Sequence, residues 1–485
     1  MHLLSILSRV STKLIVELHS ATSRKIQPIL VILITGLFGL VSASVSAQSP
    51  GDYRSITNGD WSSLATWERY DGSLWQAAIV APSSTDNVIT IQNGNTVTVN
   101  SIVNADQLSI ATGGSLLISG SGSLTINDGT GTDLDVNGTL TLNGPTLTQL
   151  TSSSISVNSG GTFLFNAGAI GGDGNIDVQN GGAFNFAGTG AMFITGTKTI
   201  NNAGTVNWTS IAPVIDFNGG NVTLSNNSNF NISANAAMNN GGNVSSAFTI
   251  NNGSTGIITK TGAGTSIFGA GVVVSSTIGG VVQVSDGTLR FNSAVLTNFG
   301  TLNVGGIGKT LDLVNATTSF NGNTSITGSG DININGGTTS IGFAVQVPSG
   351  IAVNFSAGII QGGNTIRFLN SSAMNWSGGE FRGFAGMIIN SGANLNISNT
   401  VGIKGNNLIT NNGTATWASG STIQYGAGGT NAQIQNNGVF NIAGATGFVD
   451  AGGGSNTFYF TNELSATLNK TIGNTTLDNN AFFQN

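Results

Sequence analysis

The chain has 485 residues, of which 7% are charged and 39% are hydrophobic, and this balance excludes a disordered chain. Four basic residues and one acidic residue lie in the first 47, which leaves 10 basic and 19 acidic residues and a net charge of −9. No basic face is left for nucleic acid or an anionic membrane surface. Both histidines, His2 and His19, also lie in the first 47, and there is no cysteine. Residues 48–485 therefore cannot form Cys/His catalytic pairs or zinc sites built on those ligands.

The first predicted element is a signal peptide. The stretch "KIQPILVILITGLFGLVSASVSAQS" (Lys25–Ser49) has a charged flank, an apolar core and a small-residue cleavage site. We predict a signal peptide over residues 1–47, cleaved after Ala47 so that the mature chain begins at Gln48; the alternative is an uncleaved anchor. No later stretch approaches the ~18 apolar residues of a spanning helix, so we expect no transmembrane segment in the mature chain.

Aromatic residues gather in residues 48–100, which hold three of the six tryptophans and two of the four tyrosines. The residues after this region carry a regular repeat that predicts a solenoid. A solenoid needs a cover over its first coil, because that coil otherwise exposes an open edge and core. We therefore predict an N-terminal capping region over residues 48–100. The alternative is that its aromatic side chains contact glycan, and the candidates are Trp61, Trp67, Tyr70 and Trp75.

Residues 101–485 carry a repeat of the form Gly-x-Φ-x-Φ, where Φ is apolar, with a mean step of about 23 residues. Fifteen matches begin at Gly114, Gly138, Gly161, Gly182, Gly204, Ser228, Gly253, Gly280, Gly300, Gly330, Gly350, Ser372, Gly392, Gly413 and Gly438. The even spacing predicts an all-β fold, a parallel β-helix (β-solenoid) of roughly 17 coils and about 80 Å in length. The general preference for right-handed crossovers predicts a right-handed helix.

Within each match, the two apolar positions should point inward and stack from coil to coil. Trp208, Trp376 and Trp417 are therefore expected in the core. The residue between the two apolar positions is often Asn and should point outward, where stacked amides can hydrogen-bond along the rod. These residues are Asn185, Asn207, Asn231, Asn303, Asn333, Asn354, Asn375, Asn396 and Asn441.

Three stretches resemble known families of bacterial surface proteins. "IITKTGAGTSIFGAG" (Ile257–Gly271), followed by "VSDGTLRF" (Val284–Phe291), resembles the autotransporter-associated β-strand repeat. "MNWSGGEFRG" (Met374–Gly383) is similar to W-S-G-G repeats of large bacterial surface proteins. Ala65–Val99 resembles the start of the eight-glycine domain of Bacteroidetes surface proteins, with matches at Trp67, Pro82, Asp86, Ile91, Gly94, Val97 and Val99.

The resemblance implies a pectin lyase-like parallel β-helix that acts as an adhesin, secreted by or displayed on the outer surface of a Gram-negative bacterium. Its partners would be carbohydrate or components of a cell surface or matrix. No C-terminal membrane barrel or sorting domain is recognisable, so we expect either a fragment or a stand-alone passenger.

Enzymes also use this fold, and their sites need clustered carboxylates or Ca²⁺ with a basic residue. Asp133 and Asp135 are expected on one face with Asp128 near, as a Ca²⁺ site or as a solvated strand. Glu380 and Arg382 should point outward together, and a catalytic cluster there would require Arg367 beside them. We predict no catalytic residue and no cofactor other than Ca²⁺. The favoured function is adhesin-like or structural, and the alternative is a polysaccharide lyase or glycoside hydrolase.

Overall fold

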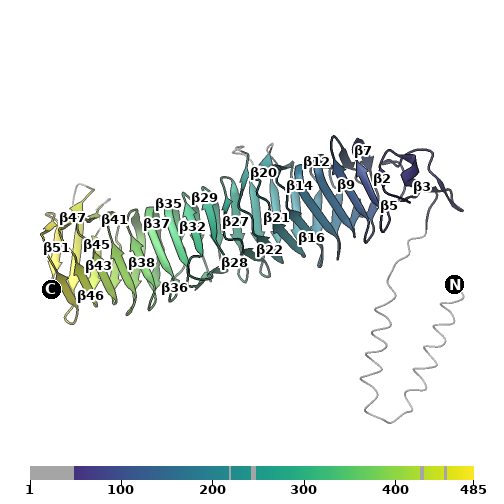
Figure 1. The fold of residues 1–485 in the computed structure, drawn as a ribbon. Helices are drawn as coiled ribbons and strands as arrows, with labels where there is room; N and C mark the ends of the chain where they lie inside the picture. Colours follow the sequence, from purple (N-terminus) through teal and green to yellow (C-terminus); the bar gives the residue numbers. More distant parts are fainter. Residues whose placement is uncertain (1–47, 218–219, 242–246, 427–430, 453–455) are drawn as a thin grey trace, which may run out of the picture. The chain divides into compact units, whose positions relative to one another are not determined.

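The computed structural model describes residues 48–217, 220–241, 247–426, 431–452 and 456–485. The predicted signal peptide, residues 1–47, lies outside the described residues. Residues 50–485 form one unit, a parallel β-solenoid of about 16 turns with about 23 residues per turn. In Figure 1 the colours of this unit advance steadily from purple to yellow along the rod, so sequence neighbours are also neighbouring coils. The predicted all-β solenoid and its period are confirmed.

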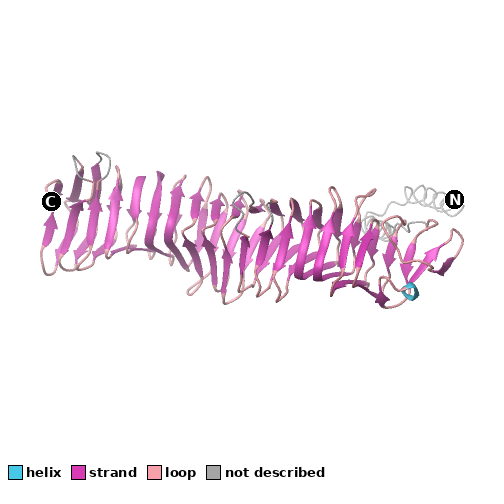
Figure 2. Ribbon diagram, turned by 90° about the horizontal axis from the view of Figure 1, so that it is seen from above, coloured by secondary structure: helices cyan, strands magenta, loops and turns pink. Residues whose placement is uncertain are grey.

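Each turn contributes strands to three parallel stacks, and each strand pairs with the strands one turn before and one turn after it. Figure 2 shows these strands running side by side across the rod, with loops at the edges. Stack 1 contains β6 (Thr96–Val99), β9 (Ser115–Ser119), β16 (Ala183–Phe186), β19 (Thr205–Trp208), β22 (Asn229–Ile232), β25 (Ile257–Lys260), β28 (Val281–Val284), β31 (Thr301–Val304), β34 (Ser325–Gly328), β36 (Val345–Val347), β42 (Leu408–Asn411), β45 (Asn431–Asn436), β48 (Thr457–Asn462) and β51 (Ala481–Gln484).

The other two stacks follow the same plan. Stack 2 contains β7 (Ile102–Ala105), β10 (Ser123–Ile126), β17 (Met192–Thr195), β20 (Val214–Phe217), β23 (Ala237–Asn240), β26 (Thr265–Phe268), β29 (Thr288–Asn292), β32 (Thr310–Val314), β38 (Ala373–Trp376), β40 (Asn394–Ile397), β43 (Thr414–Trp417), β46 (Val439–Ile442) and β49 (Thr467–Lys470). Stack 3 contains β5 (Ile89–Ile91), β8 (Leu108–Ile110), β11 (Leu134–Val136), β13 (Ser154–Val157), β15 (Asn175–Val178), β18 (Lys198–Asn202), β21 (Val222–Asn226), β24 (Phe248–Asn252), β27 (Val272–Ser276), β30 (Val295–Asn298), β33 (Thr317–Phe320), β41 (Thr400–Lys404), β44 (Thr422–Tyr425), β47 (Thr446–Asp450) and β50 (Thr475–Leu477).

Five longer strands bend around a corner and belong to more than one stack. They are β12 (Thr139–Gln149), β14 (Thr162–Gly172), β35 (Asp331–Ile341), β37 (Ala352–Phe368) and β39 (Glu380–Ile389). Gly168 allows such a bend within β14, because its φ is +95° and an added Cβ would lie 1.7 Å from the carbonyl oxygen of Gly144. Any larger residue at this position would clash with the backbone of the preceding turn.

The core is a continuous column of inward side chains, as the alternating pattern predicts. Trp208, Trp376 and Trp417 are fully buried, which confirms their expected place in the core. Aromatic rings contact one another from turn to turn, for example Phe163 and Phe184 with ring centroids 4.9 Å apart. No single turn could bury these rings alone, and stacking the turns makes the core continuous.

The predicted single column of fifteen repeats is wrong in one respect, because its members lie in two stacks. The matches from Gly114 to Gly300 precede strands of stack 1, whereas those from Gly330 to Gly438 precede strands of stack 2. The switch falls at the one step of 30 residues. The match at Gly253 is also out of phase, since Ile258 rather than Ile257 points inward.

The N-terminal cap consists of β1 (Tyr53–Ser55), β2 (Gly59–Asp60), the 3-10 turn η1 (Leu64–Thr66), β3 (Trp67–Tyr70) and β4 (Trp75–Ala77). β3 pairs antiparallel with both β1 and β4, unlike the parallel strands of the rod. β1 and β2 pair in parallel with β5 and β6. The parallel pairing of the rod thus begins before residue 100, where the cap was expected to end. Only the β3–β4 hairpin and the turns beside this hairpin lie outside the parallel pairing.

Candidate functional site

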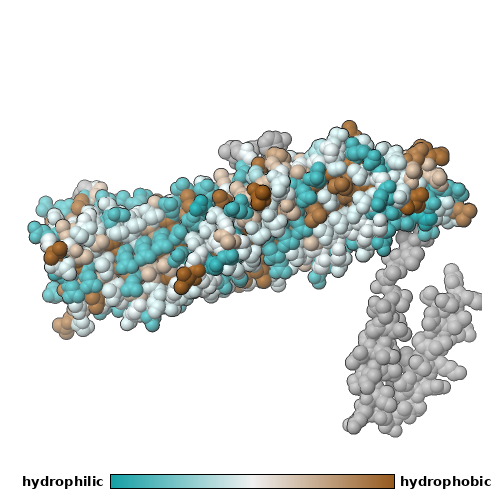
Figure 3. All heavy atoms as spheres, viewed as in Figure 1, coloured by the Kyte–Doolittle hydropathy of each residue, from teal (hydrophilic) through white to brown (hydrophobic). Residues whose placement is uncertain are grey.

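A shallow groove of about 420 Å³ lies on the outward side of stack 3, across β39, β41 and β44. Figure 3 shows the wider surface around the rod as mostly hydrophilic or neutral on the face seen, with scattered hydrophobic residues. The groove is lined by Gly337, Gly358, Ile359, Gly379, Glu380, Thr400, Val401, Gly402 and Gln424.

The groove exists because one position in a column of outward side chains is glycine. Ile359, Glu380, Gly402 and Gln424 are in register on four consecutive strands. Gly402 leaves a gap between the carboxylate of Glu380 and the amide of Gln424. A Cβ added at Gly402 would lie 2.8 Å from the Cβ of Glu380, so a side chain there would fill the gap and press on its neighbour.

The lining beside this gap is also built from backbone. Gly358 and Gly379 have φ values of +94° and +72°, a conformation that residues with a side chain rarely adopt. A Cβ on Gly379 would lie 2.5 Å from the Phe355 ring. These glycines let successive turns pack closely and keep side chains out of the groove.

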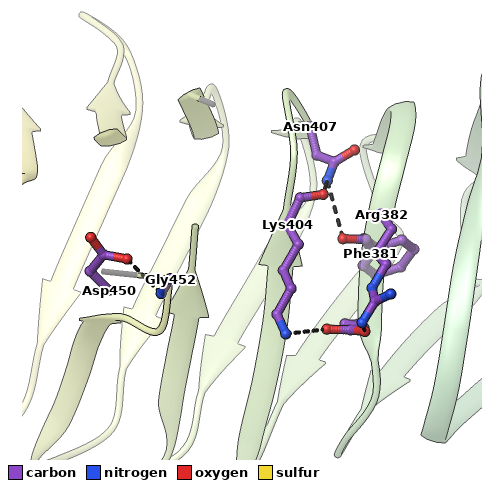
Figure 4. Close-up of polar contacts among 7 residues, drawn as sticks. Phe381, Arg382, Lys404, Asn407, Asp450 and Gly452 are labelled. Atoms are coloured by element: carbon purple, nitrogen blue, oxygen red, sulfur yellow. Dashed lines mark hydrogen bonds and ion pairs between the residues drawn. The ribbon is translucent and has the colours of Figure 1, made fainter. Parts of the chain in front are cut away.

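One carboxylate in the groove is held by two cations. The Lys404 Nζ atom lies 2.7 Å from Glu380 Oε2, and Arg382 Nη2 pairs with Glu380 Oε1. In Figure 4 the side chains of Lys404 and Arg382 extend from neighbouring strands to the same carboxylate, that of Glu380, with Asn407 above them. The Asn407 amide donates to the carbonyl oxygens of Lys404, at 2.7 Å, and of Phe381, at 3.2 Å, which ties the end of β41 to the start of β39. The three charged groups together carry a net charge of +1.

The sequence located part of this group. Glu380 and Arg382 point outward from β39, as expected from their positions on either side of Phe381. Arg367 does not join them, because it lies in stack 1 and pairs with Gln346 and Ile388. Sequence reasoning missed Lys404, which stacks directly on Arg382. The signal available in the sequence was the separation of 22 residues between Arg382 and Lys404, which is close to the length of one turn.

The predicted Ca²⁺ candidates do not lie together on one outward face. Asp133 is buried, and its carboxylate accepts hydrogen bonds from the backbone N–H of Gly129, at 2.8 Å, and of Ser154, at 2.7 Å. Asp135 faces outward and accepts a hydrogen bond from the Asn158 amide at 3.2 Å.

A third carboxylate, Asp106, lies near Asp128 and Asp133 and was missed. Burial, and then the charges of Asp133 and Asp128, raise its pKa. Among the described residues, no group of three or more acidic, His or Cys side chains has the arrangement of a metal site.

Of the four aromatic glycan-contact candidates, two lie inside the cap. The Trp61 and Trp67 indole N–H groups donate to the carbonyl oxygens of Pro82, at 2.9 Å, and of Trp61, at 2.7 Å, and both rings are buried. Their burial agrees with the capping role and removes them as contact residues. Tyr70 and Trp75 reach the surface with ring centroids 5.3 Å apart, and the guanidinium of Arg54 lies over Trp75.

The predicted outward asparagine ladder is present, divided between stacks 1 and 2. Its hydrogen bonds join Asn207 to Asn185, Asn231 to Asn207, Asn354 to Asn333, Asn375 to Asn354 and Asn396 to Asn375, with distances of 2.7–3.0 Å. Asn441 lies in the same column but is separated from Asn396 by Thr416, and it accepts from Asn469 at 2.9 Å.

Two further ladders are buried at strand ends and were missed. They join Asn202, Asn226 and Asn252 in stack 3 and Asn411, Asn436 and Asn462 in stack 1. The signal for them was the Asn-Asn pair that ends many strands.

No described helix is long and apolar enough to cross a membrane. Comparisons of the chain with protein-family models and with curated proteins gave no significant match.

Proposed function

We propose that the protein is a secreted or cell-surface β-helix, adhesin-like in character, that binds glycan or another polymeric surface through its polar outward faces. The observation that carries the proposal is the outward ladder of stack 2. Asn333, Asn354, Asn375 and Asn396 repeat at successive turns, and hydrogen bonds fix the rotamer of each amide.

An amide group has two N–H donors and two acceptor lone pairs. Asn354 uses one donor towards Asn333 and one lone pair towards Asn375, which leaves a donor and a lone pair for a ligand. Sugar hydroxyls both donate and accept hydrogen bonds, so they match this pattern. Each contact is weak, but a polymer that engages many turns gains affinity because later contacts form within the same complex.

Export and surface display are part of the same proposal. They are supported by the signal-like stretch before Gln48 and by the resemblance of the repeats and of Ala65–Val99 to those of autotransporter passengers and Bacteroidetes surface proteins. An adhesin that presents a long face needs little movement, which suits a rod whose turns are tied together by backbone and amide hydrogen bonds.

A glycan array probed with residues 48–485 tests the proposal. We expect retention of a class of oligosaccharide, and weaker retention by a variant with Asn354, Asn375 and Asn396 changed to Ala. The matched control changes Asn185, Asn207 and Asn231, the ladder of stack 1, and reports whether one face is preferred. If the wild-type protein retains no glycan, a purely structural role replaces this proposal.

A polysaccharide lyase or glycoside hydrolase is the second candidate, favoured by the carboxylate of Glu380 beside Lys404 in the groove. Such an enzyme would shorten a uronic-acid polysaccharide, and Glu380→Gln would abolish the cleavage. Binding without any change in polymer length would instead support the adhesin-like function.

A further inference from the structure

We propose that the groove at Gly402 is a subsite for one acidic sugar residue, with Glu380 and Gln424 on either side of the ring and Lys404 and Arg382 binding its carboxylate. This inference rests on the proposed function, because it names the chemical class of glycan and the place on the rod where that class is recognised.

The dimensions of the gap suit a single sugar ring. Glu380 and Gln424 are two strands apart, so their backbones are separated by roughly 9–10 Å. Their side chains narrow this gap from both sides, and the absence of a side chain at Gly402 leaves its centre empty. A groove of about 420 Å³ lies in the usual size range of small-molecule sites. Because Glu380 and Gln424 lie one turn before and one turn after Gly402, they bound the gap along the rod.

The groups around the gap can bind hydroxyls. Within the described part of the chain, the Gln424 amide has no hydrogen-bond partner, so its donors and acceptor are available. The exposed Thr400 adds a hydroxyl on the same lining. Glu380 is fixed by its two ion pairs and is only 15% exposed, so it presents a preorganised acceptor. Preorganised polar groups lose less entropy when a ligand binds.

The charge around Glu380 favours an anionic ligand. Two cations face one carboxylate, and the Arg382 side chain is 49% exposed. A guanidinium has five N–H donors, and Glu380 is contacted by one of its nitrogens, which leaves donors for a second carboxylate. Charge-assisted hydrogen bonds of this kind are roughly twice as strong as neutral ones. Residues 48–485 carry a net charge of −9, so this group is opposite in sign to the chain as a whole.

The test measures binding of residues 48–485 to a panel of uronate oligosaccharides and to their methyl esters, which keep the sugar and remove the charge. We expect at least one uronate to bind about tenfold more tightly than its ester. Lys404→Gln and Arg382→Gln should each remove most of that preference. Gly402→Thr and Gln424→Ala should weaken binding of the uronate and of the ester together, because they change the gap rather than the charge.

Matched controls separate the subsite from effects on folding. Gly447→Thr adds the same side chain to stack 3 where its column neighbours are Thr422 and Thr476, and an added Cβ meets nothing closer than 3.9 Å. Lys309→Gln removes a comparable ion pair, with Asp286, on another part of the rod. Both controls should bind like the wild type, and thermal melts should show that all variants remain folded.

Two results overturn the inference. If uronates and esters bind equally, or if the Gly402 and Lys404 variants bind like the wild type, the subsite is wrong although the glycan-binding function stands. If no glycan of any class binds, the proposed function fails and the subsite fails with it.

Discussion

The side-chain amide of Asn226 donates a hydrogen bond to Oδ1 of Asn252, one turn later, over 2.8 Å, and both side chains are fully buried. The Oδ1 atom of Asn226 in turn accepts from Asn202 at 2.7 Å. A buried amide without partners is costly, so each of these amides needs a polar partner on the neighbouring turn, and for Asn252 that partner is the Ser276 hydroxyl, at 3.1 Å. The outward amides make similar bonds next to water, where an unpaired group can be solvated.

The two kinds of ladder should therefore differ in stability. Asn226→Ala leaves the Oδ1 of Asn252 and an N–H of Asn202 unpaired in the core, and we expect a loss of about 2–4 kcal/mol in the free energy of unfolding. Asn375→Ala removes two bonds at the surface and should cost about 1–2 kcal/mol. Denaturant titration of both variants measures the difference. Equal losses would contradict the distinction between the buried and exposed amides.

The period and the core of the solenoid could be predicted from the sequence, because inward apolar side chains recur at nearly equal intervals. The assignment failed after Gly300, where the next strand of stack 1 is β34. In β34 the second inward position is Gly328 rather than an apolar residue, so the pattern vanished there and reappeared in stack 2 at Gly330. Three stacks with similar patterns cannot be told apart without knowing the pairing register.

The candidate site was harder to predict for the same reason. Glu380 and Arg382 are close in sequence, and their common outward direction follows from strand alternation. Their contact with Lys404 and the gap at Gly402 depend on the register between β39 and β41. The chain that separates the two paired segments includes the corner inside β39, and the sequence does not show where that corner falls. A shift of one residue would have placed Lys404 inside the core.

The cap offers a test of burial against exposure. Trp67→Ala removes a buried ring that contacts Trp61 edge-on at 5.1 Å, and we expect a loss of about 3–5 kcal/mol. Trp75→Ala removes a partly exposed ring beneath Arg54 and should cost much less. Thermal melts of the two variants give the comparison. A larger loss of stability for Trp75→Ala would show that the β3–β4 hairpin contributes more to the stability of the cap than the buried pair Trp61 and Trp67.

The carboxylate of Asp133 is expected to be structural and not to need Ca²⁺. Its two oxygens already accept from Gly129 and from Ser154. We therefore expect the melting temperature to stay the same in EDTA and in millimolar Ca²⁺, whereas Asp133→Ala should lose about 1–3 kcal/mol by removing the acceptor of these backbone N–H groups. A rise in melting temperature with Ca²⁺ that disappears in the Asp128→Asn variant would instead establish a metal site.

Export can be tested at the N-terminus. If residues 1–47 are a signal peptide, the protein released by a Gram-negative host should begin at Gln48, as measured by N-terminal sequencing or intact mass. Ala47→Phe should block cleavage, because the peptidase site accepts small residues. Accumulation of the uncleaved chain in the membrane fraction by the wild type would favour the anchor instead.

Lys198 should make stability depend on pH. Its Nζ atom is buried and donates to Gln149 Oε1 at 2.8 Å and to the carbonyl oxygen of Gly174 at 3.3 Å. Burial lowers the pKa of Lys198 to about 7, against the opposing effect of the Asp173 charge. Between pH 7 and about 10.4, the unfolded chain keeps a proton on this lysine that the folded chain has lost, so the free energy of unfolding rises with pH in that window.

The expected slope is about 1.4 kcal/mol per pH unit at most. Denaturant titrations at pH 7.5, 8.5 and 9.5 should show the wild type gaining stability relative to Lys198→Met, which cannot titrate. Burial also lowers the pKa of Lys260, but Lys260 and all other titratable groups are the same in both proteins, so the difference between the two proteins isolates Lys198. A difference that stays constant across the three pH values would mean that Lys198 remains charged in the folded chain, stabilised by Gln149 and Asp173.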